Sequence, residues 1–298
     1  MSEQEIKKHK SGFVNIIGNP NVGKSTLMNA LVGEKLSIIT SKAQTTRHRI
    51  MGIVNGEDFQ IVYSDTPGII SPNYKLQESM MGFVNTAMVD ADVFLYLVEK
   101  TAGLKSEQIT ERLKKTSIPI LIIVNKIDLS NQDEVMEALQ YWQKEFPNAE
   151  VVPISALEKF NIQRVLDLII ERLPDSPPYY DKEQLTDKTE RFFASEIIRE
   201  KILLNYQKEI PYSTEVEVES FKEDEHLIRI QTTIFVARQS QKGILIGHEG
   251  KMLKKVGTEA RKDMEAFFEK KIFLELFVKV RKDWRDSDQE LKRFGYLQ

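Results

Sequence analysis

The segment Gly18-Asn19-Pro20-Asn21-Val22-Gly23-Lys24-Ser25 constrains the fold of this chain more than any other feature. It consists of a glycine, four further residues and then Gly-Lys-Ser, and it lies between a short apolar run and a segment of helical period. This pattern is typical of a phosphate-binding loop, in which backbone N–H groups and the N-terminus of the following helix surround the phosphates. We expect Lys24 to reach the outer phosphates and Ser25 to offer its hydroxyl to Mg²⁺.

The surrounding sequence supplies the strand and helix that such a loop needs. Apolar runs predict buried strands over residues 13–17, 59–63, 93–98, 118–124 and 151–154. Segments of helical period predict helices over residues 24–32, 106–115, 132–145 and 162–173. Strands and helices in alternation predict an α/β domain, with a mostly parallel sheet and helices on both faces.

A proline-rich stretch ends this alternation. Pro174, Pro177 and Pro178 fall within five residues, which forbids a helix and favours an extended connection. The length of 298 residues also suggests two domains. We predict a first domain over residues 1–174, a linker over residues 175–189 and a second, smaller α+β domain over residues 190–298. In the second domain we expect the order helix, strand, strand, short helix, helix, strand.

Three further motifs follow predicted strands and complete one nucleotide site. Asp65 opens Asp65-Thr66-Pro67-Gly68, where the carboxylate can hold Mg²⁺ and the Gly68 N–H can sense a γ-phosphate. In Asn125-Lys126-Ile127-Asp128 the final carboxylate can accept two N–H groups that guanine offers and adenine does not. A backbone N–H of Ser155-Ala156 can reach the guanine O6. The carboxyl ends of parallel strands meet at one edge of the sheet, so the motifs predict a guanine-nucleotide site there.

We therefore expect nucleotide contacts from all four motifs. The expected nucleotide-binding residues are Gly18, Asn19, Pro20, Asn21, Val22, Gly23, Lys24, Ser25, Asp65, Thr66, Pro67, Gly68, Ile69, Asn125, Lys126, Asp128, Ser155 and Ala156.

The loop Gln44-Thr45-Thr46-Arg47-His48 precedes the second motif. A chain that hydrolyses GTP needs a threonine here that binds magnesium only while the γ-phosphate is present. We predict Thr46 for this role and keep Thr45 as the alternative, so the expected Mg²⁺ ligands are Ser25, Thr46 and Asp65. For Arg47, His48 and Arg49 two alternatives stay open: a solvated loop, or contacts with RNA or a partner.

The second domain carries a motif for nucleic acid. In Gly247-His248-Glu249-Gly250-Lys251 two glycines separated by two residues allow a turn tight enough to clamp phosphates, as in a KH domain. Lys254 and Lys255 follow and could add positive charge, whereas Glu249 opposes it. The chain has a net charge of −3, yet residues 229–262 hold eight cationic and two acidic residues. Trp284 is expected either to pack or to stack on a base.

Composition excludes several other classes. The chain has no cysteine, which rules out disulfides and cysteine-ligated zinc or iron–sulfur sites. Residues 1–10 lack the apolar run of a signal peptide, and no stretch approaches the roughly 20 apolar residues that span a bilayer. We expect a cytoplasmic protein without a transmembrane segment.

Taken together, these motifs resemble the Era family of GTPases, which combine a phosphate-loop GTPase domain with a C-terminal type II KH domain. Further segments that carry the resemblance are Gln44–Arg49, Pro177–Tyr180, Ala194–Lys201, Ala260–Met264 and Leu291–Leu297. The resemblance implies GTP hydrolysis with Mg²⁺, binding of the 3′ region of 16S ribosomal RNA and a role in maturation of the 30S subunit. It also allows peripheral contact with the inner membrane.

Residue 69 is isoleucine, which cannot orient an attacking water as the glutamine of Ras-like enzymes does. Catalysis is therefore expected to rest on Lys24, Thr46, Asp65, Gly68 and Asn21. Asn21 matches the asparagine that related potassium-stimulated GTPases use as an ion ligand, so K⁺ is a hypothetical second cofactor. The alternative is that Asn21 merely tolerates a turn conformation.

Other functions stay open at this point. A related GTPase could act in tRNA modification or in assembly of the large subunit. A chain with a degenerate nucleotide domain could bind RNA without hydrolysing GTP, but Lys24, Ser25, Thr46 and Asp65 argue against that. An ATP-dependent enzyme is opposed by Asn125 and Asp128.

Overall fold

The computed structural model describes residues 9–104 and 106–297. The expectation about an N-terminal signal peptide therefore falls almost wholly outside the described residues. The chain forms two compact units, and neither is continuous in sequence. The first unit consists of Met1–Ser37, Thr46–Pro72 and Met80–Asp187, and the second of Ile38–Thr45, Asn73–Ser79 and Lys188–Gln298.

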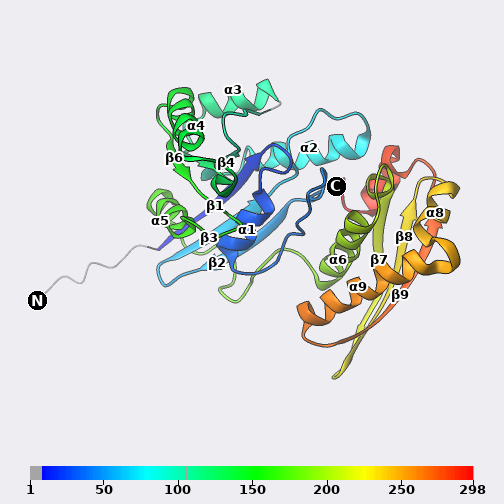
Figure 1. The fold of residues 1–298 in the computed structure, drawn as a ribbon. Helices are drawn as coiled ribbons and strands as arrows, with labels where there is room; N and C mark the ends of the chain where they lie inside the picture. Colours follow the sequence, from blue (N-terminus) through cyan, green and yellow to red (C-terminus); the bar gives the residue numbers. More distant parts are fainter. Residues whose placement is uncertain (1–8, 105, 298) are drawn as a thin grey trace, which may run out of the picture. The chain divides into compact units, whose positions relative to one another are not determined.

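The first unit is built on a six-stranded sheet with the order β2-β3-β1-β4-β5-β6 (Figure 1). All neighbouring strands run parallel except β2 and β3. The strands are β1 (Lys10–Gly18), β2 (Ile50–Asn55), β3 (Phe59–Asp65), β4 (Val93–Val98), β5 (Ile120–Val124) and β6 (Glu150–Pro153). The strand order reverses beside β1, which is the point at which open α/β sheets bind their ligands.

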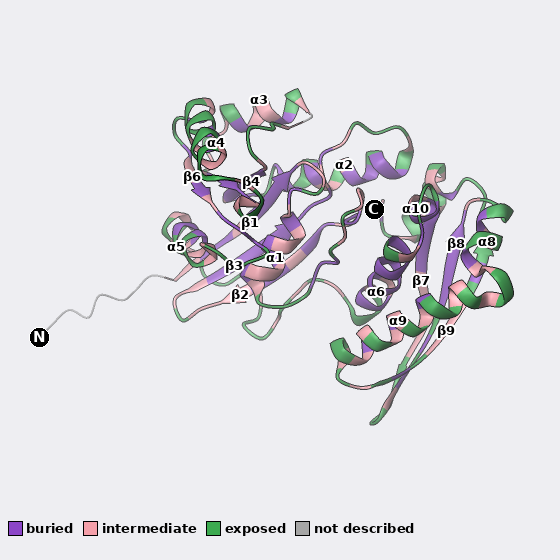
Figure 2. Ribbon diagram, viewed as in Figure 1, coloured by how far each residue is buried: buried purple, intermediate pink, exposed green. Residues whose placement is uncertain are grey.

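Helices cover both faces of this sheet (Figure 1). Alternate residues of β4 (Phe94, Tyr96 and Val98) share one buried cluster with side chains of α2, α3 and α4, and α1 and α5 contact each other on the other face. The helices are α1 (Lys24–Val32), α2 (Lys75–Ala87), α3 (Glu107–Lys115), α4 (Gln132–Glu145) and α5 (Ile162–Arg172), with a short 3-10 turn η1 (Ile127–Leu129). The central strands β4 and β5 are buried along nearly their whole length (Figure 2). The predicted α/β architecture is confirmed.

Two elements of this unit were not predicted. The antiparallel strand β2 is short and contains Gly52, which a residue with a side chain could not replace without meeting Met28 and Val32. The helix α2 is continuous but contains Gly82, a residue that lowers helix propensity. Neither segment carries a strong local signal, so packing against the rest of the unit decides their conformation.

The predicted linker packs against the first unit. The side-chain amide of Gln60 pairs with the backbone of Tyr179 and Tyr180, at distances of 2.7–3.0 Å. Leu185 then accepts a hydrogen bond of 2.8 Å from the N–H of Ile53, at the edge strand β2. Residues 175–187 therefore belong to the first unit, because they satisfy backbone groups that an edge strand would otherwise leave open.

The second unit has a three-stranded sheet with the order β7-β8-β9, in which β7 and β8 are antiparallel and β8 and β9 parallel (Figure 1). Its main elements are α6 (Glu190–Asn205), β7 (Thr214–Glu223), β8 (Leu227–Val236), α8 (Gln239–Ile246), α9 (Lys251–Phe268) and β9 (Lys271–Val280). Shorter elements are α7 (Ile210–Ser213), η2 (His248–Gly250), η3 (Trp284–Asp286) and α10 (Asp288–Arg293). The main elements follow the predicted order, and the type II KH fold is confirmed.

The core of this unit lies between the sheet and the helices α6, α8 and α9. Trp284 is fully buried, and its indole N–H donates to the carbonyl of Ser213 at 3.0 Å. Of the two alternatives for Trp284, packing is therefore correct. No helix in the described part of the chain is both long and apolar enough to cross a bilayer.

Candidate nucleotide-binding site and nucleic-acid interface

The phosphate-binding loop joins β1 to α1, as its motif predicts. Gly23 has φ 100°, and a Cβ atom built there would lie 2.2 Å from the Asn125 amide nitrogen, so only glycine fits. The Lys24 ammonium is buried and donates to the carbonyls of Gly18 at 3.2 Å and Asn19 at 2.9 Å. Burial lowers the pKa of Lys24 to about 8, against the opposing charge of Asp65. A phosphate anion at this loop would stabilise the charged lysine.

Three oxygen-bearing side chains converge beside the loop. The Ser25 hydroxyl donates to the Asp65 carboxylate at 2.7 Å and lies 2.9 Å from the Thr46 hydroxyl. Thr46 also donates to the same carboxylate oxygen at 3.3 Å. The hydroxyl of Thr45 instead contacts Thr40 at 2.6 Å and the Lys42 carbonyl at 2.7 Å. The structure thus directs Thr46, and not Thr45, toward Ser25 and Asp65.

This arrangement fits a small, hard cation. The Oδ1 atom of Asp65 is buried and has no hydrogen-bond partner within residues 9–104 and 106–297. Burial raises the pKa of Asp65, while Lys24 and neighbouring hydroxyls oppose that shift. A buried carboxylate with an unsatisfied oxygen is costly, and a divalent cation would offset the cost. One carboxylate and two hydroxyls are hard oxygen donors, which suits Mg²⁺ completed by water and phosphate oxygens.

Other acidic clusters do not compete for this role. Within the described ranges, no group of three or more His, Cys, Asp or Glu side chains could hold a metal ion. The cation therefore depends on the nucleotide for part of its coordination shell, because the protein provides too few charged ligands by itself.

The Asp65–Gly68 motif leaves β3 and closes over the phosphate-binding loop. Thr66 donates to the carbonyl of Ile16 at 2.8 Å. A Cβ atom at Gly68 would lie 2.7 Å from the backbone of Pro20, so this close approach requires glycine. The Ile69 side chain is 1% exposed and belongs to the core of the first unit, and its N–H donates to the Gly18 carbonyl. Its placement in the core fits the expectation that Ile69 does not orient a water.

The predicted base-recognition residues also meet at the carboxyl ends of their strands. The side chain of Asn125 donates to the Val22 carbonyl at 2.8 Å and accepts from the Ala156 N–H at 3.0 Å. The Ala156 N–H, one of the two that we expected could reach guanine O6, is therefore engaged by Asn125. Asp128 is exposed, and one of its oxygens accepts from the Ser155 hydroxyl at 2.5 Å. Asn125 thus ties the phosphate loop to the base-recognition loop.

Neither expectation for the basic residues after Thr46 holds for Arg47 and Arg49. Both are buried rather than solvated, which also removes them from contact with RNA. The Arg49 guanidinium donates to both carboxylate oxygens of Asp90, to Asn15 and, at 2.6 Å, to the Ser64 hydroxyl. The role of Arg49 is structural: this network anchors β3, the strand that ends at Asp65, and nothing in the local sequence around Arg49 points to it.

The glycine clamp of the second unit has the predicted tight geometry. Gly247, Glu249 and Gly250 have φ values of 73°, 52° and 72°. The Lys251 ammonium lies 2.9 Å from the Glu249 carboxylate, so the acidic residue partly neutralises the first lysine of α9. Lys254 and Lys255 are exposed on the same helix.

A groove of about 380 Å³ runs from this clamp along α9 and β9. Its lining combines two cations, apolar side chains and two glycines, a mixture suited to single-stranded nucleic acid. The lining residues are Gly250, Leu253, Lys254, Gly257, Thr258, Arg261, Leu274 and Leu276. Six lining residues were not among the predicted RNA-binding residues: Leu253, Gly257, Thr258, Arg261, Leu274 and Leu276. The spacing of 250, 254, 257, 258 and 261 on one helical face is the signal that could have found those on α9.

Comparison with known proteins agrees with both folds. Residues 13–126 match the family model of a 50S ribosome-binding GTPase, and residues 209–285 match that of a KH domain. The chain is 50% identical to GTPase Era of Syntrophus aciditrophicus, over 96% of this chain and 95% of the relative. It is 45% identical to GTPase Era of Clostridium kluyveri, over 96% of this chain and 99% of the relative.

Two solved structures are similar along nearly the whole chain. One is a crystal structure of Era in complex with MgGDPNP and nucleotides 1506–1542 of 16S ribosomal RNA, with a TM-score of 0.92 and 36% identity. It matches 97% of this chain and 100% of its own. The other is a variant of Aquifex aeolicus Era bound to GDP and AlF4−, with the same TM-score, identity and coverage.

Proposed function

The chain belongs to the Era family of GTPases, and on that premise we propose that it is a GTP-driven switch acting in maturation of the 30S ribosomal subunit. In this role it binds the 3′ region of 16S ribosomal RNA through the groove along α9. The observation that carries the proposal is the presence in one chain of two sites. One is a guanine-nucleotide site with a loop threonine at its cation position, and the other is a glycine-clamped cationic groove.

The switch follows from the chemistry of Thr46. We propose that Ser25, Thr46 and Asp65 bind Mg²⁺ while GTP is present, and that Gly68 senses the γ-phosphate through its N–H. When bound, Mg²⁺ neutralises charge that develops on the phosphates. Lys24 and the N–H groups of the phosphate loop supply the remaining stabilisation. After hydrolysis the γ-phosphate no longer orders the two loops, which release.

The RNA target is proposed from the groove and from the relatives. Lys254 and Arg261 place positive charge along the groove, and the apolar floor of Leu253, Leu274 and Leu276 offers surface on which bases can pack. Gly247, Gly250 and the residues between them would clamp the backbone, together with Lys251 and Lys255. The similar Era structure holds nucleotides 1506–1542 of 16S ribosomal RNA, which makes the equivalent region our proposed ligand.

Crosslinking in cells tests this proposal. We expect ultraviolet crosslinking of the full chain, followed by sequencing of the attached RNA, to recover the 3′ end of 16S ribosomal RNA above the background of untagged cells. Recovery of 23S ribosomal RNA or tRNA instead would contradict the proposal. Recovery of tRNA would favour the alternative of a GTPase in tRNA modification. Recovery of 23S ribosomal RNA would favour a GTPase in large-subunit assembly, to which the description of the matching GTPase family model also points.

Location follows from the proposed target. We propose that the protein works in the cytoplasm, with peripheral contact at the inner membrane as a hypothesis. Fractionation at low and high salt tests the second part, because a peripheral contact should release from membranes as ionic strength rises.

We further propose that K⁺ assists hydrolysis through Asn21. Asn21 is exposed in the phosphate loop and has φ 63°, a conformation that asparagine tolerates better than most residues. The conformational role and the ion-ligand role can therefore be separated. We expect GTP turnover to be several-fold faster in potassium than in sodium at matched ionic strength.

Substitution of Asn21 distinguishes the two roles. Asn21→Gly keeps the backbone conformation but removes the amide oxygen, so it should abolish the difference between the salts. Asn21→Asp keeps a side-chain oxygen and should retain the difference between the salts. Equal wild-type rates in potassium and sodium, measured as phosphate release, would remove K⁺ from the mechanism.

A further inference from the structure

The helix α6 is buried on both faces, although one of these faces is charged (Figure 2). Ile198 and Ile202 belong to the core beneath the sheet of the second unit. Glu196, Arg199, Glu200 and Lys201 are each less than 9% exposed. The segments Ile38–Thr45 and Asn73–Ser79 belong to the same unit. Four buried charged residues need polar partners, and Arg199 finds two of its partners in the segment Ile38–Thr45.

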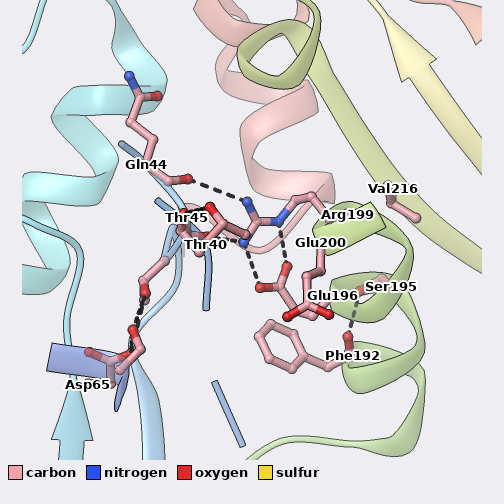
Figure 3. A network of polar contacts seen from close by, with 12 residues as sticks. Thr40, Gln44, Thr45, Asp65, Phe192, Ser195, Glu196, Arg199, Glu200 and Val216 are labelled. Carbon is pink, nitrogen blue, oxygen red and sulfur yellow. Dashed lines mark hydrogen bonds and ion pairs between the residues drawn. The ribbon is translucent and has the colours of Figure 1, made fainter. Parts of the chain in front are cut away.

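The Arg199 guanidinium makes four hydrogen bonds (Figure 3). Its Nε and Nη2 atoms donate to the two carboxylate oxygens of Glu196, each at 2.7 Å. Nη2 also donates to the backbone carbonyl of Thr45, and Nη1 to that of Gln44 at 3.4 Å. The planar guanidinium has N–H donors in fixed directions and can bond the carboxylate and both carbonyls at once, whereas the ammonium group of a lysine could not.

The stability of α6 alone does not explain why the buried Arg199–Glu196 ion pair is present. Burying a charged pair costs desolvation energy that well-packed apolar residues would avoid. Burial alone would lower the pKa of Arg199, but the charge and hydrogen bonds of Glu196 outweigh it and the pKa is raised. The guanidinium therefore stays charged at every working pH. Its two outward bonds go to carbonyls of residues that lie outside any helix or strand.

The segment that Arg199 holds is strained. Gln44 has φ 56°, a left-handed conformation that costs free energy in a residue other than glycine. Its side-chain oxygen accepts from the Tyr74 hydroxyl at 3.0 Å, and the Tyr74 ring lies 4.7 Å from the guanidinium of Arg285. The backbone at Gln44 is therefore fixed by α6 and by a second side chain, not by a regular hydrogen-bond ladder of its own.

Thr46 follows Thr45 in the chain, and its hydroxyl lies with Ser25 and Asp65 at the cation position. The carbonyl of Thr45 and the N–H of Thr46 belong to one planar peptide group, so fixing the first orients the second. We propose that Arg199 is a positioning residue for GTP hydrolysis, holding the Thr45–Thr46 peptide so that the Thr46 hydroxyl is presented to magnesium. This inference rests on the proposed role of Thr46.

Arg199→Gln in the full chain tests the inference. Losing a charge-assisted hydrogen bond to Thr45 should lower GTP turnover about tenfold or more and raise the Mg²⁺ concentration needed for half-maximal turnover. GDP affinity should stay within about twofold of wild type, because the threonine binds the metal only while the γ-phosphate is present. A purely structural role would weaken the binding of GDP and of a non-hydrolysable GTP analogue alike.

Three further variants separate the outcomes. Arg191→Gln removes an exposed arginine of the same helix, which donates to the Val218 carbonyl at 3.3 Å, and should leave turnover unchanged. Arg199→Lys keeps the positive charge but loses the planar set of N–H donors, so its GTP turnover should fall between those of wild type and Arg199→Gln. It serves as the test if the glutamine variant does not fold. Thr46→Ala should reproduce the loss of turnover and the raised Mg²⁺ requirement.

The outcomes also distinguish this inference from the proposal on which it rests. Normal turnover in Thr46→Ala would remove the role of Thr46, and the inference with it. Impaired turnover in Thr46→Ala with normal turnover and Mg²⁺ requirement in the Arg199 variants would overturn the inference alone. Equal losses of GDP and GTP-analogue affinity in the Arg199 variants would also overturn it.

Discussion

We expect Asp128→Asn to weaken GTP binding and to make xanthosine triphosphate the better ligand. A carboxylate can accept both of the neighbouring N–H donors on guanine, whereas an amide offers one acceptor and one donor. One guanine donor then faces another donor, and an unmet buried polar group costs about 1–3 kcal/mol, or roughly tenfold or more in affinity. Xanthine carries an oxygen where guanine has its amino group, so it should accept a bond from the amide.

The structure predicts which way the new amide would face. One oxygen of Asp128 accepts from the Ser155 hydroxyl at 2.5 Å, and the amide oxygen can retain that bond. Its NH₂ group would then point toward the base. Titration with fluorescent GTP and xanthosine triphosphate measures both affinities. Asp133→Asn, which changes an exposed carboxylate at the start of α4, is the control and should alter neither. Unchanged GTP affinity in Asp128→Asn would remove guanine recognition from this residue.

The second large effect concerns the groove along α9. We expect Gly250→Asp to lower the affinity for the 16S 3′ fragment about tenfold or more while leaving GTP binding intact, because the new side chain sets a negative charge against the clamped phosphates. A Cβ atom at Gly250 meets no atom within 4 Å, and aspartate tolerates the left-handed conformation found there. The variant should therefore fold.

A matched control and a variant of opposite sign sharpen this prediction. Gly243 on α8 also has open space around a built Cβ atom but does not line the groove, so Gly243→Asp should bind RNA normally. Glu249→Gln removes the acidic partner of Lys251 and should raise RNA affinity by up to about fivefold. Filter binding at several salt concentrations measures all three. If Gly250→Asp and Gly243→Asp bind equally well, the groove is not the RNA site.

Lys251 and Lys255 should contribute to RNA affinity by neutralising phosphates, which makes their contribution depend on salt concentration. Substituting Lys251 and Lys255 by alanine should reduce the slope of log affinity against log salt by about one unit for each phosphate that the variant no longer neutralises. Lys251 is paired with Glu249 at 2.9 Å and Lys255 lies 3.9 Å from Glu259, so the reduction should be smaller than two free lysines would give.

Most of the nucleotide site could be predicted from local sequence. Each motif follows directly on a strand, and a strand followed by a glycine turn and a helix has little freedom to place its residues elsewhere. Thr46 was predicted over Thr45, and the structure directs its hydroxyl toward Ser25 and Asp65 because Thr45 is bonded to Thr40 and Lys42. The order of elements in the second unit was equally predictable, since its strands and helices are long and well separated.

The parts that could not be predicted involve residues far apart in the chain. The proline-rich segment looked like a free linker, because nothing local indicates that Gln60 and Ile53 offer it hydrogen bonds. Arg49 was expected either to be solvated or to contact RNA or a partner, because Asp90, which it binds, lies 41 residues further on. In both cases a polar or charged group has no partner in the nearby sequence and is hydrogen-bonded by a residue far away in the chain.

Sequence alone determined the fold class, the identity of the nucleotide motifs and the glycine clamp, because each is set by spacing within a few residues of the chain. Tertiary structure decided which charged side chains became buried and what they hold. Arg199 and the Thr45 carbonyl are 154 residues apart, and only the folded chain brings them into one hydrogen bond. A buried charge must find its partner wherever the fold places one, and periodicity along the chain carries no information about that partner.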